Sequence, residues 1–154
     1  MKRSQKKLGE ILIGKGLITD EQLTEALTEQ QRTNEFLGKI LVKNNYLKEK
    51  DLLGALSEQF NIPLVSLKSK YIDWRLVKQF DSDLILDYRY FPVLKDEWSV
   101  TIAIVNPLDA WALKKAEEGS RGLKLKVVLV SEGDMKEVVG RYQQHMRSST
   151  LEAL

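Results

Sequence analysis

Two glycines and two glutamines, repeated at one spacing, are the residues of this chain best suited to ligand chemistry. The segment from Lys7 to Gln30 recurs from Phe36 to Gln59, 29 positions further along the chain. The recurring residues are Leu8, Gly9, Ile11, Leu12, Leu23, Ala26, Leu27, Glu29 and Gln30 in the first copy and Leu37, Gly38, Ile40, Leu41, Leu52, Ala55, Leu56, Glu58 and Gln59 in the second. Such a repeat usually is one supersecondary unit used twice. Packing explains the apolar members, so the glycines and glutamines need another reason.

Each of these polar or small residues has a structural and a ligand interpretation. Glycine inside a helix costs roughly 1 kcal/mol relative to alanine, so Gly9 and Gly38 indicate that a neighbouring helix or a ligand approaches the backbone. A buried, unpaired amide costs about 1–3 kcal/mol, so Gln30 and Gln59 either cap the loop after their helix or hold a ligand. Recurrence in both copies gives the two interpretations equal weight. Two equivalent sites related by pseudo-two-fold symmetry would suit a planar ligand that has a two-fold axis.

No group of residues in the sequence supports catalysis. The only histidine, His145, has no metal-ligand partner at a useful spacing and is expected at the surface. The phosphate-binding pattern G-x-x-x-x-G-K-[ST] is absent, and Gly14-Lys15-Gly16 follows a predicted helix rather than a strand. The neighbouring carboxylates Asp81 and Asp83 read as turn residues. We therefore predict a protein that is not an enzyme and has no metal site and no cofactor.

The composition excludes several other classes of protein. A net charge of +2, from 24 basic and 22 acidic residues, argues against nucleic-acid binding as the main role. The basic start at Lys2, Arg3, Lys6 and Lys7 is interpreted as a solvated tail. No stretch reaches the ~20 apolar residues that a membrane helix needs, so direct membrane insertion is not expected. With no cysteine, a cytoplasmic location is predicted.

The first 62 residues are expected to form a unit of four short helices. Within the first copy, Leu8 and Leu12 lie on one helix face, and Gly16 is placed to end that helix. Thr19 begins T-D-E-Q, a capping-box pattern that starts a second, longer helix. The second copy repeats this helix, turn and helix. The unit ends where Asn61 is followed by Ile62 and Pro63.

Residues 63–146 are expected to form a small α+β unit. Its predicted elements are an extended stretch or strand at Val65–Lys70, helices at Trp74–Phe80 and Asp83–Tyr90, strands at Phe91–Leu94 and Ser99–Val105, a helix at Asp109–Glu118, a strand at Leu123–Val130 and a helix that Ser131 opens. The order β-β-α-β-α predicts a sandwich with its helices on one face of the sheet. Residues 147–154 are interpreted as a tail or linker.

The two copies and the segments that follow them resemble the MshEN cyclic di-GMP-binding domain. The family pattern is roughly R-L-G, apolar pairs, a glycine, L-x-x-x-L and a closing Q. Later matches are F-N-I-P-L-V-S-L, F-P-V-L and T-I-A-I-V-N-P-L-D. This domain forms the N-terminal part of type II secretion and type IV pilus assembly ATPases. The resemblance implies a non-catalytic regulatory domain that binds cyclic di-GMP.

The resemblance also assigns ligand-binding residues. They are Lys7, Leu8, Gly9, Leu12, Gln30, Phe36, Leu37, Gly38, Leu41, Gln59 and Asn106. Family members typically carry arginine at the head of the first copy and aspartate before the proline of N-P-L-D, where this chain has Lys7 and Asn106. The second copy has Phe36 at its head and Asn45 where the first has Gly16. Because lysine keeps the charge that phenylalanine lacks, we expect the first copy to hold a shared ligand more tightly.

A second interpretation needs no nucleotide. In the family, the domain docks onto the cytoplasmic part of an inner-membrane platform protein and so positions the ATPase. This chain would then serve as a protein-docking module, with the platform protein and its own ATPase domain as partners. A standalone adaptor without an ATPase is a third interpretation. Cyclic di-GMP would raise the thermal stability of a receptor by mass action, but not that of a docking module.

Overall fold

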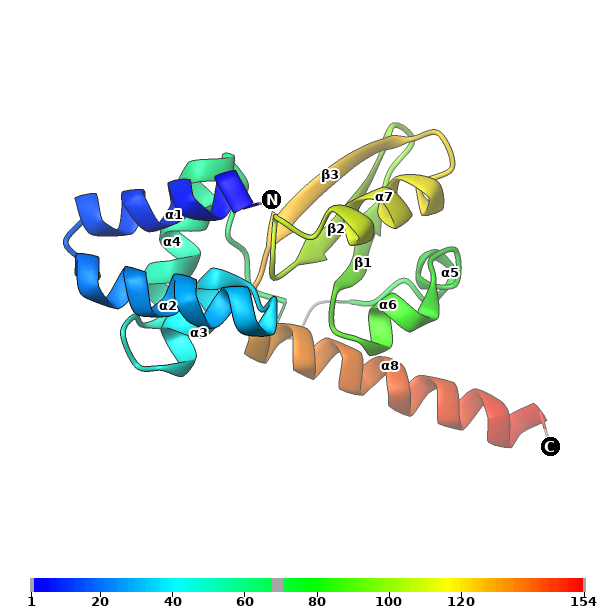
Figure 1. The fold of residues 1–154 in the computed structure, drawn as a ribbon. Helices are drawn as coiled ribbons and strands as arrows, with labels where there is room; N and C mark the ends of the chain where they lie inside the picture. Colours follow the sequence, from blue (N-terminus) through cyan, green and yellow to red (C-terminus); the bar gives the residue numbers. More distant parts are fainter. Residues whose placement is uncertain (1, 68–70, 154) are drawn as a thin grey trace. The chain divides into compact units, whose positions relative to one another are not determined.

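The computed structural model describes residues 2–67 and 71–153 (Figure 1). They divide into two compact units, Met1–Ile62 and Pro63–Leu154. The first unit contains four helices among its described residues: α1 at Lys2–Gly14, α2 at Asp20–Thr33, α3 at Leu37–Lys43 and α4 at Glu49–Phe60. The second contains α5 to α8 and a three-stranded sheet. The predicted α+β class is confirmed.

The turn that ends α1 is built in the same way as the turn that ends α3. The Leu17 amide donates to the Leu12 carbonyl, and the Tyr46 amide donates to the Leu41 carbonyl. The residue before each of these donors has left-handed backbone, with φ of 71° at Gly16 and 62° at Asn45. This is the Schellman arrangement, which glycine adopts without strain and asparagine tolerates. The prediction that Gly16 ends the first helix is confirmed.

The two longer helices start differently. The Thr19 hydroxyl accepts from the Gln22 amide at 3.1 Å, and the Gln22 side chain accepts from the Thr19 amide at 2.9 Å, so the predicted capping box is confirmed. At the equivalent position of the second copy, Lys48 offers no side-chain cap to α4. Lysine has no acceptor atom in its side chain, so α4 begins without this stabilisation.

The helices of the two copies pack on one another rather than forming separate pairs. Helix α1 packs on α4, and α2 packs on α3. The core between them consists of fully buried side chains from both copies: Leu8, Leu12, Ala26, Leu37, Ile40, Leu41 and Leu56. Neither copy could bury these faces alone, which explains why the sequence carries the unit twice.

Both repeated glycines are approached by a leucine from the next helix. A Cβ atom added at Gly9 would lie 2.5 Å from Leu23 Cδ1, and one added at Gly38 would lie 2.6 Å from Leu52 Cδ1. Leu23 and Leu52 are themselves equivalent members of the repeat. Of the two interpretations of the glycines, the structure therefore supports close helix packing.

The second unit is built on a sheet of order β1-β2-β3. The two predicted strands, β1 (Tyr90–Lys95) and β2 (Ser99–Ile104), form an antiparallel hairpin with an irregularity in register between Pro92 and Leu94. Strand β3 (Lys124–Leu129) pairs with β2 in parallel after the crossover helix α7 (Ala110–Gly119). Both the predicted strand at 123–130 and the helix that Asp109 caps are confirmed.

Three further helices complete the second unit. Helix α5 (Trp74–Val77) begins where predicted, after its cap Asp73, but it ends three residues before the expected Phe80. Helix α6 (Ser82–Leu86) is capped by Asp81. The helix expected to reach Tyr90 ends earlier, because Tyr88 has a φ of 61° and Tyr90 begins β1. Of the extended stretch predicted at 65–70, Val65 pairs with Leu129 and residues 68–70 lie outside the described part.

Helices cover both faces of the sheet, not one as predicted. Tyr90 contacts the Phe80 ring edge-on, and that ring lies against Gly119 of α7. The next residue, Phe91, contacts Tyr142 of helix α8 (Glu132–Ala153) edge-on. Successive strand residues point to opposite faces, so α7 and α8 lie on opposite sides of the strands (Figure 1). All six residues of β2 are accordingly buried.

Helix α8 also extends further than the sequence predicted. The Ser131 hydroxyl accepts from the Asp134 amide at 3.1 Å, which confirms the predicted start. The helix continues to Ala153, so residues 147–153, interpreted as a tail or linker, are helical. Side chains from Arg147 to Leu151 are exposed.

An ion pair joins the start of β1 to the start of α7. Arg89 donates from Nε to Asp109 Oδ2 at 2.8 Å and from Nη2 to Oδ1 at 2.6 Å, and the Asp109 carboxylate also caps the Ala112 amide. Burial acts to raise the pKa of Asp109, but the hydrogen bonds from Arg89 and Ala112 outweigh it and lower that pKa. The charged form of Asp109 is thus favoured by folding.

We predict that Gly9→Ala and Gly38→Ala each lower the free energy of unfolding by about 1–2 kcal/mol. The added methyl group displaces Leu23 or Leu52, which outweighs the better helix propensity of alanine. The matched control is Gly54→Ala in α4, where nothing lies within 4 Å of the new Cβ; it should stabilise by up to ~1 kcal/mol. Urea unfolding measures all three, and stabilisation by Gly9→Ala would contradict the packing described.

We also predict that Asp109→Asn destabilises the protein by roughly 2 kcal/mol at pH 7, since it removes charged hydrogen bonds from a largely buried pair. The pKa of Asp109 is lower in the folded state, so its contribution is present above the unfolded-state pKa and disappears as the pH falls through the folded-state pKa. The difference between wild type and variant should therefore shrink on acidification. Glu118→Gln, which removes the pair between the exposed Glu118 and Lys115, should change stability by less than ~0.5 kcal/mol.

Candidate functional site

The turn in the middle of each copy contacts the end of the other copy in a reciprocal way. Lys15 Nζ lies 2.7 Å from Glu58 Oε2, and Asn44 Nδ2 lies 3.5 Å from Glu29 Oε1. Lys15 and Asn44 are equivalent positions of the repeat, as are Glu29 and Glu58. Each copy therefore contacts the other through the same pair of positions, which is the pattern of a two-fold axis. The unit has the pseudo-two-fold relation that the sequence suggested.

The first repeated glutamine ties down the spacer between the copies. Gln30 Nε2 donates to the Glu35 carbonyl at 3.0 Å, in the segment that leads from α2 into α3. This contact fixes the entry of Phe36, whose backbone begins α3. The loop-capping interpretation thus accounts for Gln30.

The second glutamine is not explained in this way. Gln59 Oε1 is buried and has no hydrogen-bond partner among the described residues. An unpaired buried acceptor costs about 1–3 kcal/mol, and such atoms in native proteins usually have a function or an unseen partner. Gln59 is therefore the member of the predicted set that folding alone explains least.

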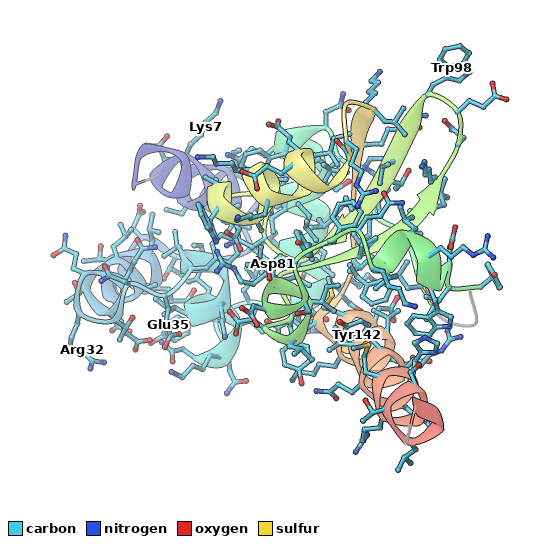
Figure 2. The ribbon with its side chains drawn as sticks, turned by 90° about the vertical axis from the view of Figure 1, so that its right-hand side faces the viewer. Lys7, Arg32, Glu35, Asp81, Trp98 and Tyr142 are labelled. Carbon is cyan, nitrogen blue, oxygen red and sulfur yellow. The ribbon has the colours of Figure 1, made fainter. Side chains whose placement is uncertain are left out.

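The heads of the two copies differ in exposure and chemistry. Lys7 is exposed and its side chain points away from α1 (Figure 2). Phe36 is half-buried, and its Cε1 would lie 2.9 Å from a Cβ atom at Gly38, so its ring lies over that glycine. One head offers a cation to solvent, and the other offers part of an aromatic ring.

The four leucines predicted to flank a ligand lie in the core. Leu8, Leu12, Leu37 and Leu41 have no exposed side-chain surface. Their role in the structure is to hold α1 and α3 in place beneath the residues at the surface.

Asn106 belongs to the second unit. It lies between β2 and α7, where its Oδ1 accepts from the Leu108 amide at 2.9 Å. The asparagine thereby shapes the turn that places Asp109 at the start of α7. Its Oδ1 already has a partner within this turn.

The sequence did not single out a group of acidic residues on α2 and in the spacer that follows it. The Tyr46 hydroxyl donates to Glu25, and this hydrogen bond, followed by desolvation and the charge of Glu25, raises the pKa of Tyr46. Glu29 Oε2 and Glu35 Oε2 are buried without a hydrogen-bond partner in the described part of the chain. In the sequence, these acidic residues are marked only by the recurrence of Glu29 at Glu58. Helical periodicity alone predicts that both glutamate side chains are solvated.

The remaining predicted features concern metals and membranes. Residues 2–67 and 71–153 contain no group of three or more histidine, cysteine or acidic side chains that could hold a metal ion. None of the helices in those ranges has the length and apolar character needed to cross a bilayer. His145, expected at the surface, is half-buried because it stacks on Trp74 with a ring separation of 4.0 Å.

Comparison with known proteins places the fold in a family. The model of the MshEN domain matches residues 60–149, which begin where the second copy ends. The type IV pilus assembly ATPase PilB of Myxococcus xanthus (strain DK1622) is 28% identical over 136 residues, covering 88% of this chain. The chain spans 24% of that protein.

Solved structures agree with this assignment. The structure of MshE with cdg, that is cyclic di-GMP, has a TM-score of 0.76 at 24% identity and covers 88% of this chain and 97% of that one. The N-terminal domain of XpsE has a TM-score of 0.70 at 17% identity and covers 88% and 93%. At these identities the structures show a shared fold. With the family match over most of the chain, they show that this chain belongs to the MshEN domain family, as its sequence predicted.

Proposed function

We propose that this chain is a non-catalytic regulatory domain of a pilus or secretion ATPase and that it binds cyclic di-GMP through its two repeated segments. The observation that carries the proposal is the buried, unpaired Gln59 Oε1 in a unit whose two copies contact each other reciprocally. Support also comes from MshE, which has this fold and was solved with cyclic di-GMP. We expect the domain to act in the cytoplasm, next to its ATPase.

The chemistry of the ligand suits the residues of the first unit. Cyclic di-GMP has two guanines, two phosphates and a two-fold axis, so each copy would hold one half. A guanine edge carries N–H donors, and Gln59 Oε1 is an acceptor without a partner. Lys7 would supply charge to a phosphate, and the ring of Phe36 would stack on a base. Asn106 enters the proposal only through the family resemblance.

This proposal changes the roles expected for two groups of residues. The buried leucines Leu8, Leu12, Leu37 and Leu41 would position the binding residues instead of flanking the purines. The glycines, which receive Leu23 and Leu52, would do the same. Because Gln30 already holds the spacer, Gln59 would contribute more to affinity than Gln30. This reverses the expectation, drawn from Lys7 and Phe36, that the first copy binds more tightly.

We predict that calorimetric titration of the chain with cyclic di-GMP gives a Kd below about 100 μM, or ~5.5 kcal/mol of binding free energy. Gln59→Leu should weaken binding at least tenfold, because the donor on the ligand loses its acceptor. The control Gln31→Leu changes an exposed glutamine next to Gln30 and should leave the Kd within twofold. No heat and no rise in Tm at 1 mM ligand would rule out the receptor role.

Substitutions of the two glutamines should also differ in their effect on stability when no ligand is present. Gln30→Leu removes the hydrogen bond to the Glu35 carbonyl and should lower the free energy of unfolding by about 1–2 kcal/mol. Gln59→Leu removes an unpaired acceptor and should be neutral or stabilising by up to ~1 kcal/mol. Urea denaturation compares them directly. If Gln59→Leu were the more destabilising of the two, Gln59 would be a structural residue and the proposal would lose its main support.

A protein-docking function is the second candidate, with the inner-membrane platform protein as partner. Large apolar side chains on the second unit favour it: Tyr71 is 85% exposed and Trp98 is 78% exposed. Tyrosine and tryptophan are enriched at protein–protein interfaces. Docking without a nucleotide would leave the Tm unchanged when cyclic di-GMP is added, which separates this candidate from the first.

A further inference from the structure

The outer edge of β3 is unpaired along most of its length in the sheet that the structure describes. Strand β2 pairs with β3 from Lys124 to Leu129. The Lys124 amide donates to the Trp98 carbonyl, and the Val130 amide donates to the Ile104 carbonyl. Alternate residues of the strand, counted from Lys124, therefore direct their backbone groups toward β2. Alternation along the strand then directs the amides and carbonyls of Leu125 and Val127 to the open side.

One position of this edge already takes an additional strand. The Leu129 amide donates to the Pro63 carbonyl at 2.8 Å, and the Val65 amide donates to the Leu129 carbonyl at 2.9 Å. This parallel bridge, between Leu64 and Leu129, is isolated. Leu125 and Val127 continue the same row of outward groups, so the rest of the edge has the geometry that strand pairing requires.

The side chains along the edge select a partner by charge. Lys124 and Lys126 are exposed and lie on one face of the strand, while Leu125 and Val127 are half-buried on the other. Trp98 precedes β2 in the hairpin turn, and its ring points away from the strands (Figure 2). A strand with acidic residues opposite the two lysines would complement this edge.

The same charges disfavour a second copy of this chain. Two β3 strands related by a two-fold axis would pair antiparallel with both lysine rows on one face, and like charges across a strand pair are destabilising. Edge lysines are a common means of preventing such self-association. The two lysines thus disfavour pairing with a second copy of this chain and favour pairing with an acidic strand.

We propose that the open edge of β3 binds an extended acidic segment of a partner protein as an added strand. The partner's backbone would pair with Leu125 and Val127, and its acidic side chains would face Lys124 and Lys126. Recognition by strand addition combines main-chain hydrogen bonds with alternate side-chain contacts. This surface belongs to the second unit and does not depend on the binding of cyclic di-GMP.

A capped synthetic peptide of ten residues that alternates glutamate and valine tests the proposal on the full chain. We expect saturating peptide to slow hydrogen exchange of the Leu125 and Val127 amides about tenfold. Lys124→Glu should weaken binding at least tenfold. The control Lys136→Glu makes the same charge change at an exposed position on α8 and should leave the Kd within twofold. A peptide with lysine in place of glutamate should bind at least tenfold more weakly.

Three results would overturn the proposal. The first is binding that leaves the exchange of Leu125 and Val127 unchanged. The second is an equal loss of affinity in Lys124→Glu and Lys136→Glu, which would indicate attraction to net charge alone. The third is protection of the two amides by raising the protein concentration without peptide, which would identify a second copy as the occupant. Circular dichroism of each variant verifies that it is folded.

Discussion

The first unit depends on one repeated contact, the leucine that packs against a glycine in the preceding helix. Leu23 reaches Gly9 and Leu52 reaches Gly38 at distances that leave no room for a Cβ atom. This brings the two helices of each copy close together and leaves their leucine faces to be buried by the other copy. Dispersion and the hydrophobic effect act over the whole core, but they need this close approach to be effective. The reciprocal contacts at the helix ends follow from it.

The second unit obtains its rigidity from different interactions. Every residue of its central strand is buried, and the pair between Arg89 and Asp109 fixes where α7 begins relative to β1. The edge of β3 is left open beside this rigid layer. An unpaired strand edge of a rigid sheet can accept an added strand, whereas the two-fold repeat of the first unit would suit a symmetrical small ligand. The division of the chain into two units would allow the two kinds of recognition that we propose.

Local features of the fold were predictable because their causes lie within a few residues. The capping box at Thr19, the left-handed turns at Gly16 and Asn45, and the start of α8 at Ser131 all depend on hydrogen bonds to nearby backbone groups. The extent of α8 and the covering of both sheet faces were not predicted correctly. The covering of both faces depends on which residues meet across the fold: Phe91 reaches Tyr142, and Phe80 reaches Gly119. The side chains of α8 from Arg147 to Leu151 are exposed, so these contacts do not explain why the helix continues.

The sequence by itself determined the repeat, its equivalent positions and the resemblance to the MshEN family. It could not distinguish the two interpretations of the glycines or of the glutamines, because each pair is identical in type and spacing. Only the tertiary structure made that distinction: leucines fill the space beside both glycines, Gln30 pairs with the Glu35 carbonyl, and Gln59 Oε1 has no partner among the described residues. The physical reason is that hydrogen bonding and close packing depend on three-dimensional neighbours, which equal positions in a repeat need not share.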